Sequence, residues 1–535
     1  YEKPFAVLYA DEASRPNIPI NVLVGLETLK AGFGWSDEEM YENFCFNLQV
    51  RYTLGYRQLN DGHFEIRTIY NFRRRLSDHM QQRGQALLAE AFVQITDEQL
   101  AAFALQTSKL RMDSTQVSSN IRQFSRLQLL VEVLQRVQYS LSDPDQQRYQ
   151  ADFEPYLCGS AGQYVYHLKP GSYDQHLAQI GQFMHSLVTE LAADYAEQPD
   201  YQLLLRVFHE HFIVETDDDD DPAGGQWRPR QSAELSADSL QSPDDGEATY
   251  RVKRGQGYQG YVTNVTESCH PDNPLQLIVD LHTAPNNTDD AAMLADSLPT
   301  LKQRTGVEEM HTDGGYNSPD LVDPLLRQHQ VELVQSAIRG RQPNPTKLNL
   351  DDYTWQLDPN GQPLTVTAPS GQRAEVEPGR VTDRYIGRFT PPPAQTVSAT
   401  TEAPTEKSAP PPVLYFSRRQ LDLALRRQRT AQERASSPNL RAAVEASIGA
   451  LKRPFPNDKL PVRGLFRVSS MLIGSALMIN LRRIHRYQTA KNHQKEDQQG
   501  PGISSKPFFS LPSIRLIRLL VSDLSFFLRF RSVYP

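Results

Sequence analysis

The spacing of apolar residues divides the first 215 residues of the chain into helical regions separated by one short strand. Residues 18–105 carry apolar positions at helical spacing, and Ser36 with Glu39 three residues later predicts a capping box at a helix start. Residues 126–214 repeat the helical pattern in longer amphipathic stretches such as RLQLLVEVLQRV. Between them, SKLRMDSTQV predicts a strand with Asp113 at or near its end.

From Ala248 onward the pattern becomes that of β-structure. The run YRVKRGQGYQGYVTNVTES predicts a hairpin turned by Gly255 and Gly257. LQLIVDLHTA then predicts a third strand that ends near Asp280 and His282. Gly255 and Gly257 do not form a phosphate-binding fingerprint, because no helix follows the loop.

Strands and helices then alternate. NNTDDAAMLADSLPTLKQR predicts a helix capped by Thr288 or Asp289. VEEMHTDGGYNSPDL predicts a short strand, then Asp313 ahead of two glycines, then a helix beginning at Ser318. VELVQSAIRG is typical of another buried strand. The alternation predicts an α/β fold, with a mixed sheet and helices on its faces.

The last third of the chain begins with β character and ends in basic helices. WQLDPNGQPLTVTAP predicts strands around an Asn-Gly turn, and FTPPPAQTVSATTEAPTEKSAPPP predicts a disordered linker. Three helices follow, in VLYFSRRQLDLALRRQRTAQERA, in RAAVEASIGALK and over the apolar stretch from Met471 to Leu481. Beyond about Gln488 we expect irregular structure.

Charge is segregated along the chain, although the net charge is only -8. Residues 215–247 hold eleven acids and two bases, and the run Asp217 to Asp221 predicts a solvated connector. Residues 413–488 hold fifteen Lys and Arg against four acids. The second segment is suited to face a polyanion.

The remaining composition restricts the compartment. Three cysteines, Cys45, Cys158 and Cys269, are far apart and odd in number, which predicts neither a disulfide framework nor a cysteine zinc site. The first residues carry no signal-peptide pattern, and no apolar run reaches the roughly 18 residues of a membrane span. We therefore expect a cytoplasmic protein that has no membrane partner.

Three acids stand out by position: Asp113 and Asp313 near strand ends, and Glu445 on a late helix. Strand ends in α/β folds point into the site crevice, and three converging carboxylates can hold two Mg²⁺ ions roughly 3.5–4 Å apart. Taken singly, Asp113 is better explained as a helix cap, and Glu445 as part of an ordinary charge pair on a surface helix. Asp280, Asp289 and Asp290 are further candidates for the metal-binding acids, but a position at a strand end or at a helix cap explains them better. His282 and His311 are better explained as structural histidines.

Basic residues accompany these acids. Arg441 precedes Glu445 by four residues and Lys452 follows it by seven, so the three side chains share a helix face in RAAVEASIGALK. In the N-terminal region, Arg73, Arg74 and Arg75 cluster on one helix. Small helices with an arginine cluster suit a helix-turn-helix-like DNA-binding unit, and a solvated basic face of a bundle explains them as well.

In this combination the chain resembles the DDE transposases of bacterial insertion sequences, from about Asn21 to about Ile484. RMDST resembles the first-aspartate motif and HTDGGYNSP the second, while RAAVEASIGALK followed by LPVRGLFRV resembles the glutamate motif. One branch of the family has Tyr, two residues, Arg, three residues, Glu, six residues and Lys. Arg441, Glu445 and Lys452 match that spacing, but Pro438 stands at the Tyr position.

The resemblance implies a ribonuclease-H-like mixed sheet flanked by helices, preceded by an all-α DNA-binding domain and interrupted by a helical insertion. It implies that Asp113, Asp313 and Glu445 ligate two Mg²⁺ ions, with Mn²⁺ as a substitute. It also implies that Arg441 and Lys452 contact DNA and that Arg73, Arg74 and Arg75 recognise it. The expected division of the chain is as follows: 1–105, helical DNA-binding domain; 106–125, first catalytic segment; 126–214, helical insertion; 215–247, acidic linker; 248–340, second catalytic segment; 341–412, β-like insertion and linker; 413–488, basic third catalytic segment; 489–535, flexible tail.

The implied activity is metal-dependent cleavage of double-stranded DNA at terminal inverted repeats, followed by strand transfer into target DNA. The implied assembly is a homodimer on DNA, associated with the nucleoid. Relatives often carry a cysteine cluster where this chain has its Pro/Thr linker. This linker contains no cysteine, so no zinc is expected. Two alternatives remain: a transposase-derived DNA-binding protein with an idle site, and a nuclease that does not join ends.

Overall fold

The computed structural model describes most of the chain: residues 1–9, 17–58, 60–169, 171–215, 226–253, 255–338, 343–358, 361–390, 411–436 and 439–498. The predicted acidic connector at 217–221, residues 391–410 of the predicted Pro/Thr linker (389–412), Pro438 and the part of the expected tail after residue 498 lie outside these residues.

The N-terminal region is helical, as the sequence predicts. It consists of η1 (Lys3–Leu8), α1 (Ile20–Phe33), α2 (Asp37–Phe46), α3 (Leu48–Thr53), α4 (Ile66–Arg83) and α5 (Leu87–Ala102). The capping box is confirmed, because the Glu39 amide donates to Ser36 Oγ at 3.0 Å and the Ser36 amide donates to Glu39 Oε2 at 2.7 Å. Gly32 abuts the side chain of Met478, so α1 packs against α17 (Leu465–Gln498), a helix from a distant part of the chain.

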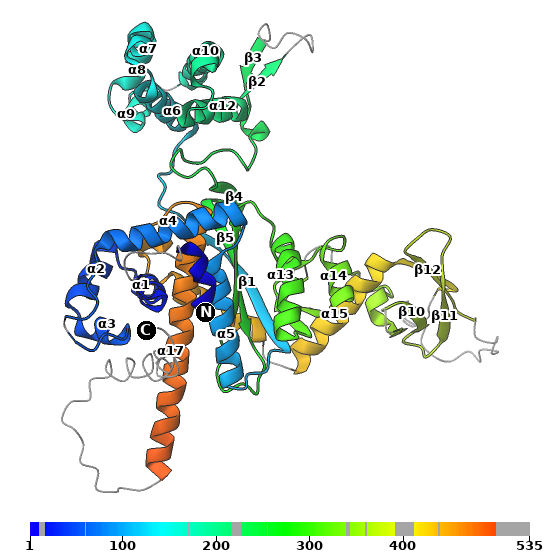
Figure 1. Ribbon diagram of the computed structural model, residues 1–535. Coiled ribbons are helices and arrows are strands. Elements are labelled where there is room, and N and C mark those ends of the chain that lie inside the picture. Colours follow the sequence, from blue (N-terminus) through cyan, green and yellow to red (C-terminus); the bar gives the residue numbers. More distant parts are fainter. Residues whose placement is uncertain are drawn as a thin grey trace.

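A mixed sheet forms the centre of the molecule (Figure 1). Its strands are β1 (Lys109–Val117), β4 (Thr249–Lys253), β5 (Gln256–Ser268), β6 (Ile278–Pro285), β7 (Glu309–Thr312) and β8 (Glu332–Gln335). β5 lies between β6 and β1 and is antiparallel to both, and β1, β7 and β8 follow as parallel neighbours. β4 extends the sheet by pairing with the first residues of β5. The predicted α/β architecture is therefore confirmed.

Helices cover both faces of this sheet. Leu110 and Met112 of β1 share one buried cluster with α13 (Asp290–Thr305) and α14 (Val322–His329). Val117 of β1 and Val265 of β5 share another with α16 (Val444–Lys452) and α17 (Leu465–Gln498). Because side chains alternate along a strand, the odd-numbered residue Asp113 faces the α16 side.

Two insertions carry cores of their own (Figure 1). The first contains α6 (Arg126–Ser140), α7 (Asp143–Arg148), α8 (Gln150–Leu157), α9 (Ala161–Tyr166), α10 (Tyr173–Glu190), α11 (Ala192–Tyr195), α12 (Pro199–His211), β2 (Phe212–Glu215) and β3 (Gln226–Pro229). The second is an antiparallel sheet of β9 (Thr354–Leu357), β10 (Pro363–Thr367), β11 (Arg373–Pro378), β12 (Arg384–Arg388) and β13 (Val413–Ser417), followed by α15 (Arg418–Ser436).

Several boundaries differ from the predicted ones. Gly257 lies within β5 opposite Val252, so it is not part of the hairpin turn. β6 continues to Pro285, because β5 is long enough to pair with it throughout, and Asp280 and His282 therefore lie inside the strand. Asp113 lies in the middle of β1.

The helix boundaries differ as well. α14 begins at Val322, because the Leu321 amide donates to the Ser318 hydroxyl in a turn before the helix. α17 runs on to Gln498 instead of ending near Gln488, through a stretch rich in Ala, Lys, Gln and Glu that favours helix. Among the described residues, no helix has the length and apolar character required to cross a bilayer.

Candidate active site

The register of β1 and β7 brings Asp113 and Asp313 to one place on the sheet. Arg111 of β1 pairs with His311 of parallel β7, and each aspartate follows its strand's paired residue by two positions. Asp313 keeps an extended backbone (φ -85°, ψ 179°), so alternation places both carboxylates on the same face. The strand pairing, and not the distance in sequence, therefore makes these two acids neighbours.

Two opposing influences act on Asp113, which is 8% exposed. Burial raises the pKa of its carboxyl above the usual value, and the neighbouring charge of Asp313 raises it further. The Arg441 guanidinium and the Ser114 amide act in the opposite direction and favour the carboxylate. A cation at this position therefore has an electrostatic role, because it relieves the repulsion between the two acids.

Backbone hydrogen bonds fix Asp313 in place. Its Oδ1 accepts from the Gly315 amide at 2.7 Å and so caps the short 3-10 helix η3 (Gly314–Tyr316). Its carbonyl oxygen accepts from Gln335 Nε2 at 3.0 Å, which ties the turn to β8. Beneath the turn, the buried hydroxyl of Tyr316 donates to Asn264 Oδ1 at 2.8 Å.

Glu445 is connected to Asp113 by Arg441, which contacts both side chains. Arg441 lies on the 3-10 helix η5 (Leu440–Ala443), and Glu445 lies in the first turn of α16. Arg441 Nη2 is 2.6 Å from Asp113 Oδ2, and Arg441 Nη1 is 3.7 Å from Glu445 Oε1. The side chain of Glu445 is 67% exposed, whereas that of Arg441 is 19% exposed. The guanidinium thus lies between two of the three predicted metal ligands.

The structure places Lys452 in a different contact. Its Nζ is 3.8 Å from Asp458 Oδ2, and burial lowers the pKa of its ammonium group. Nearby Lys253 also lowers that pKa, so two cations come close where α16 ends and β4 ends. Lys452 belongs to the same short helix as Glu445, but its described ion pair is with Asp458.

The three clustered arginines of α4 have different surroundings. Arg73 forms ion pairs with Glu27 at 2.8 Å and Asp37 at 2.7 Å, which raise the pKa of its guanidinium. Burial acts to raise the pKa of Asp37, but hydrogen bonds and charge from Arg73 and Lys30 hold it at about 2. Arg73 is therefore part of the packing between helices.

The neighbouring arginines lie at the surface. Arg74 is exposed, and Arg75 lies over the Tyr9 ring at 4.7 Å. Of the three arginines, Arg74 and Arg75 have the exposure that contact with DNA requires.

A buried ionic network beneath the site escaped prediction from the sequence. Glu267 of β5 pairs with Arg111 of β1, accepts from Ser447 of α16 and lies 3.5 Å from Arg483 of α17. Arg111 also donates to the Leu440 carbonyl at 3.0 Å. These contacts fix η5 and α16 against the sheet, and so they position Arg441 and Glu445. The available signal was an acid inside the predicted strand YVTNVTES, because a carboxylate that is buried in a sheet needs a cationic partner.

The competing acids and histidines take structural positions. Asp289 caps α13 by accepting from the Asp290 amide, as one of the two expected caps. Asp280 lies 3.7 Å from Arg304. His282 Nδ1 lies 3.1 Å from Ser297 Oγ, and His311 Nε2 lies 3.4 Å from Glu309.

The carboxylate oxygens of the site are donors that suit a hard cation, although the three acids do not converge on one position in this structure. Asp113 and Asp313 offer carboxylate oxygens on one face, which Mg²⁺ prefers. Within the described part of the chain, no three acidic, histidine or cysteine side chains are arranged to hold a metal ion. A metal ion shared by Asp113, Asp313 and Glu445 would require the Arg441 guanidinium to leave Asp113 and Glu445 to turn inward.

The N-terminal part of the chain is similar to a known protein family. A family model described as "Transposase domain (DUF772)" matches residues 1–75, from η1 to the first half of α4. No curated protein and no solved structure matches the chain. The matched residues cover the N-terminal helices and stop before the sheet, and they support a transposase.

Proposed function

We propose that the chain is a DDE transposase that cleaves DNA at transposon ends and joins the freed 3′-ends to target DNA. The observation that carries the proposal is the placement of Asp113 in β1 and of Asp313 directly after β7, the parallel neighbour of β1, with Glu445 linked to Asp113 through Arg441. The transposase-domain match over residues 1–75 supports the same class from an independent part of the chain.

The topology supports a ribonuclease-H-like core. Three antiparallel strands in the order β6, β5, β1 continue into the parallel strands β7 and β8, with helices on both faces. In this arrangement the first acid lies on the central strand β1, and the second follows its parallel neighbour β7. The third acid comes from a helix packed against β1 and β5.

In the proposed reaction, water attacks the scissile phosphodiester in line and releases a 3′-hydroxyl. That hydroxyl then attacks a phosphodiester of the target DNA and displaces a second 3′-oxygen. Asp113, Asp313 and Glu445 would hold Mg²⁺, which would supply Lewis-acid activation of the nucleophile and the leaving oxygen. Asp113 and Asp313 offer their oxygens from the sheet, and Glu445 approaches from α16.

The basic residues have separate roles in this proposal. Arg441 neutralises Asp113 until DNA and metal arrive, and a DNA phosphate then competes for its guanidinium. Lys452 at the end of α16, and Arg74 and Arg75 on α4, add phosphate contacts. We propose double-stranded DNA with terminal inverted repeats as the substrate, bound by a homodimer.

A panel of alanine variants tests the proposal. Asp113→Ala, Asp313→Ala and Glu445→Ala are each expected to abolish Mg²⁺-dependent cleavage of DNA that carries the element's ends, while DNA affinity is retained. Asp289→Ala is the matched control, because Asp289 caps α13 outside the proposed ligand set. Retained cleavage by Glu445→Ala would sink the assignment. A strand-transfer assay with pre-cleaved ends separates a transposase from a plain nuclease, which cuts but does not join.

One observation favours a second candidate, a transposase-derived DNA-binding protein with an idle site. Arg441 forms an ion pair with Asp113, and the side chain of Glu445 is mostly exposed in this conformation. An idle site predicts specific DNA binding without cleavage in either Mg²⁺ or Mn²⁺, and the same panel distinguishes the two candidates.

A further inference from the structure

A basic patch lies where the ends of α1 and α16 meet the middle of α17, and Figure 1 shows α1 and α17 side by side. Arg482 of α17 donates from Nη2 to the carbonyl oxygen of Gly32 in α1 at 2.9 Å. Gly34, just beyond α1, has a left-handed backbone (φ 71°), and a side chain there would collide with the carbonyl oxygen of Pro454. The turn after α16 therefore touches the same end of α1 as Arg482 does. The α1/α17 patch is defined by Phe33, Trp35, Arg453, Arg482 and Arg486.

The three arginines of this patch lie together without an acidic partner. Arg486 follows Arg482 by four residues, and its Nε donates to the Arg482 carbonyl oxygen at 3.3 Å. Within the described residues, no Asp or Glu lies at ion-pair distance from either of them or from Arg453, whereas the adjacent Arg483 lies 3.5 Å from Glu267. Burial lowers the pKa of the Arg482 guanidinium, and the charges of Arg486 and Arg453 lower it further. The patch therefore concentrates positive charges that the fold does not balance.

Two aromatic rings hold the Arg482 side chain in place. The rings of Phe33 and Trp35 are stacked, with their centroids 4.9 Å apart and their planes 15° apart. The Arg482 guanidinium carbon lies 5.3 Å from the centroid of the Phe33 ring, which is itself 47% exposed. Capping of the C-terminal end of α1 explains the position of Arg482 alone. It does not explain Arg453 and Arg486, which are both exposed and add positive charge beside it.

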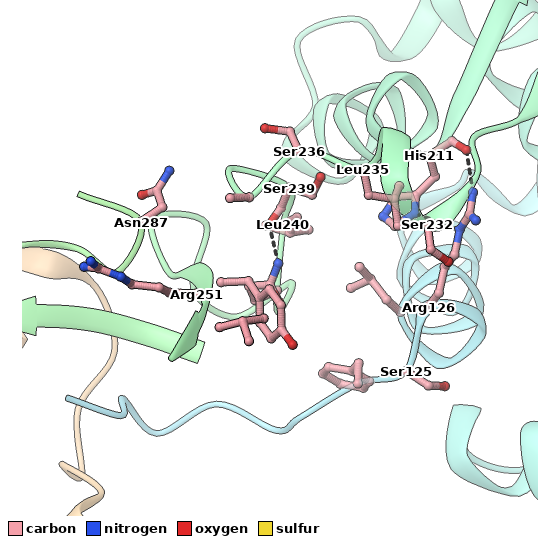
Figure 2. A pocket seen from close by; sticks show the side chains of 16 residues that line it. Ser125, Arg126, His211, Ser232, Leu235, Ser236, Ser239, Leu240, Arg251 and Asn287 are labelled. Atoms are coloured by element: carbon pink, nitrogen blue, oxygen red, sulfur yellow. Dashed lines mark hydrogen bonds between the residues drawn. The ribbon is translucent and has the colours of Figure 1, made fainter. Parts of the chain in front are cut away.

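An arginine without an acidic partner can instead be used by the fold, and Arg126 is the contrasting case (Figure 2). Its guanidinium donates to the carbonyl oxygens of His211 at 2.6 Å and Arg230 at 2.7 Å, and to His211 Nδ1 at 3.1 Å. Among the described residues, the Arg453 side chain has no hydrogen-bond partner, and Arg486 bonds only a carbonyl of its own helix. The guanidinium groups of Arg453 and Arg486 are therefore available to a partner at the surface.

The partner that this arrangement fits is a polyanion, because exposed guanidinium groups bind phosphate oxygens. Arg453 directly follows Lys452 and lies about 12 Å from Glu445 along α16. A DNA duplex carries one negative charge about every 1.7 Å, so it presents several phosphates over that distance. We propose that the α1/α17 patch binds the phosphate backbone of duplex DNA outside the catalytic site. The inference rests on the proposed function, which identifies the polyanion as DNA.

The salt dependence of DNA binding by the full chain tests this proposal. Fluorescence anisotropy of a labelled duplex of random sequence, recorded in EDTA, measures binding without cleavage, and backbone contacts do not depend on sequence. The double variant Arg453→Gln/Arg486→Gln should lower the slope of log affinity against log salt concentration by about two, because each phosphate contact contributes about 0.9. Arg453→Gln alone should lower it by about one, and lysine at both positions should restore the wild-type slope.

Arg148→Gln/Arg228→Gln is the matched control, because it removes the same charge from the helical insertion, where Glu190 and Glu234 balance both arginines. Neither Arg453 nor Arg486 bonds another element of the described structure through its side chain, so thermal melts of the patch variants should match the wild type. An unchanged slope in both patch variants, or an equal fall in the control, would overturn this inference alone. A wild type that binds no DNA would overturn the proposed function as well. Cleavage that survives Asp313→Ala would overturn the proposed catalysis and leave the comparison of slopes intact.

Discussion

Substitution of Arg441 by Gln removes the cation that, within the described part of the chain, forms an ion pair with Asp113. Arg441 Nη2 lies 2.6 Å from Asp113 Oδ2, and both side chains are mostly buried, with exposed fractions of 19% and 11%. Asp113 would then remain in a buried position beside Asp313, with only the Ser114 amide to favour its carboxylate. The variant should therefore destabilise the folded protein wherever Asp113 is ionised.

The size of the loss depends on pH. Removing one partner of a buried ion pair costs about 3–5 kcal/mol, unless the remaining group loses its charge. The pKa of Asp113 is already raised by burial, and the variant raises it further, at about 1.36 kcal/mol per pKa unit. A carboxyl with a raised folded-state pKa contributes stability at low pH that is lost as the pH rises through that pKa.

The variant and the wild type should therefore be equally stable below the ordinary pKa of 3.8, where Asp113 is protonated in both. The difference should grow with rising pH to about 3 kcal/mol at pH 8.

Urea denaturation between pH 3.5 and pH 8 measures this difference, with hydrogen exchange of β1 and α16 reporting the local effect. Arg388→Gln is the control, because its 3.8 Å pair with Glu377 is exposed and should contribute about 0–1 kcal/mol at every pH. Mg²⁺ should stabilise Arg441→Gln more than the wild type, since the metal no longer competes with the guanidinium. A stability difference independent of pH, or equal stabilisation by Mg²⁺, would refute this view of Arg441.

Two further predictions follow from the surroundings of the site. Glu267→Gln should lower the free energy of unfolding by about 3–5 kcal/mol and increase hydrogen exchange in α16, because Arg111 and Arg483 lose their buried acid. The control Glu377→Gln removes an exposed pair and should lower it by under about 1 kcal/mol. Equal urea midpoints of the two variants would contradict the positioning role of Glu267. Arg74→Gln should weaken DNA binding and reduce by about one the slope of log affinity against log salt concentration, without loss of stability. Arg73→Gln should instead lower the melting temperature of the N-terminal helices, because its ion pairs with Glu27 and Asp37 are lost. The reverse pattern in salt-dependent binding and thermal melts would contradict these separate roles.

Local patterns predicted the main helices and the strands of the central sheet, but not β2, β3 or β13. Residues 413–417, expected to begin a helix, form β13 because they pair with β12. The capping box at Ser36, the β7 strand before Asp313 and the alternation of strands with helices are all properties of neighbouring residues, and the structure has each of them. Strand ends were harder to predict, because they depend on the partner. Asp280 lies inside β6 only because β5 pairs with it to Pro285.

The sequence supplies candidate residues for the site, which stay a prediction, but it does not supply their arrangement. Asp113 and Asp313 could be singled out from sequence, yet their proximity depends on the register of β1 against β7. The contact between Arg441 and Asp113 depends on where η5 docks, which Arg111 and Glu267 determine through side-chain contacts spanning more than 150 positions of sequence. Long-range ionic contacts of this kind leave no periodic pattern along the chain.

Metal specificity of cleavage tests the proposed ligand role of the acids most directly. Mg²⁺ requires oxygen ligands, whereas Mn²⁺ tolerates a thiolate, so Asp313→Cys should cleave DNA carrying the element's ends in Mn²⁺ but not in Mg²⁺. The wild type should cleave in both and lose activity in a chelator. Equal activity of Asp313→Cys in the two metals, or wild-type cleavage without any divalent ion, would contradict the assignment of Asp313 as a metal ligand and with it the proposed active site.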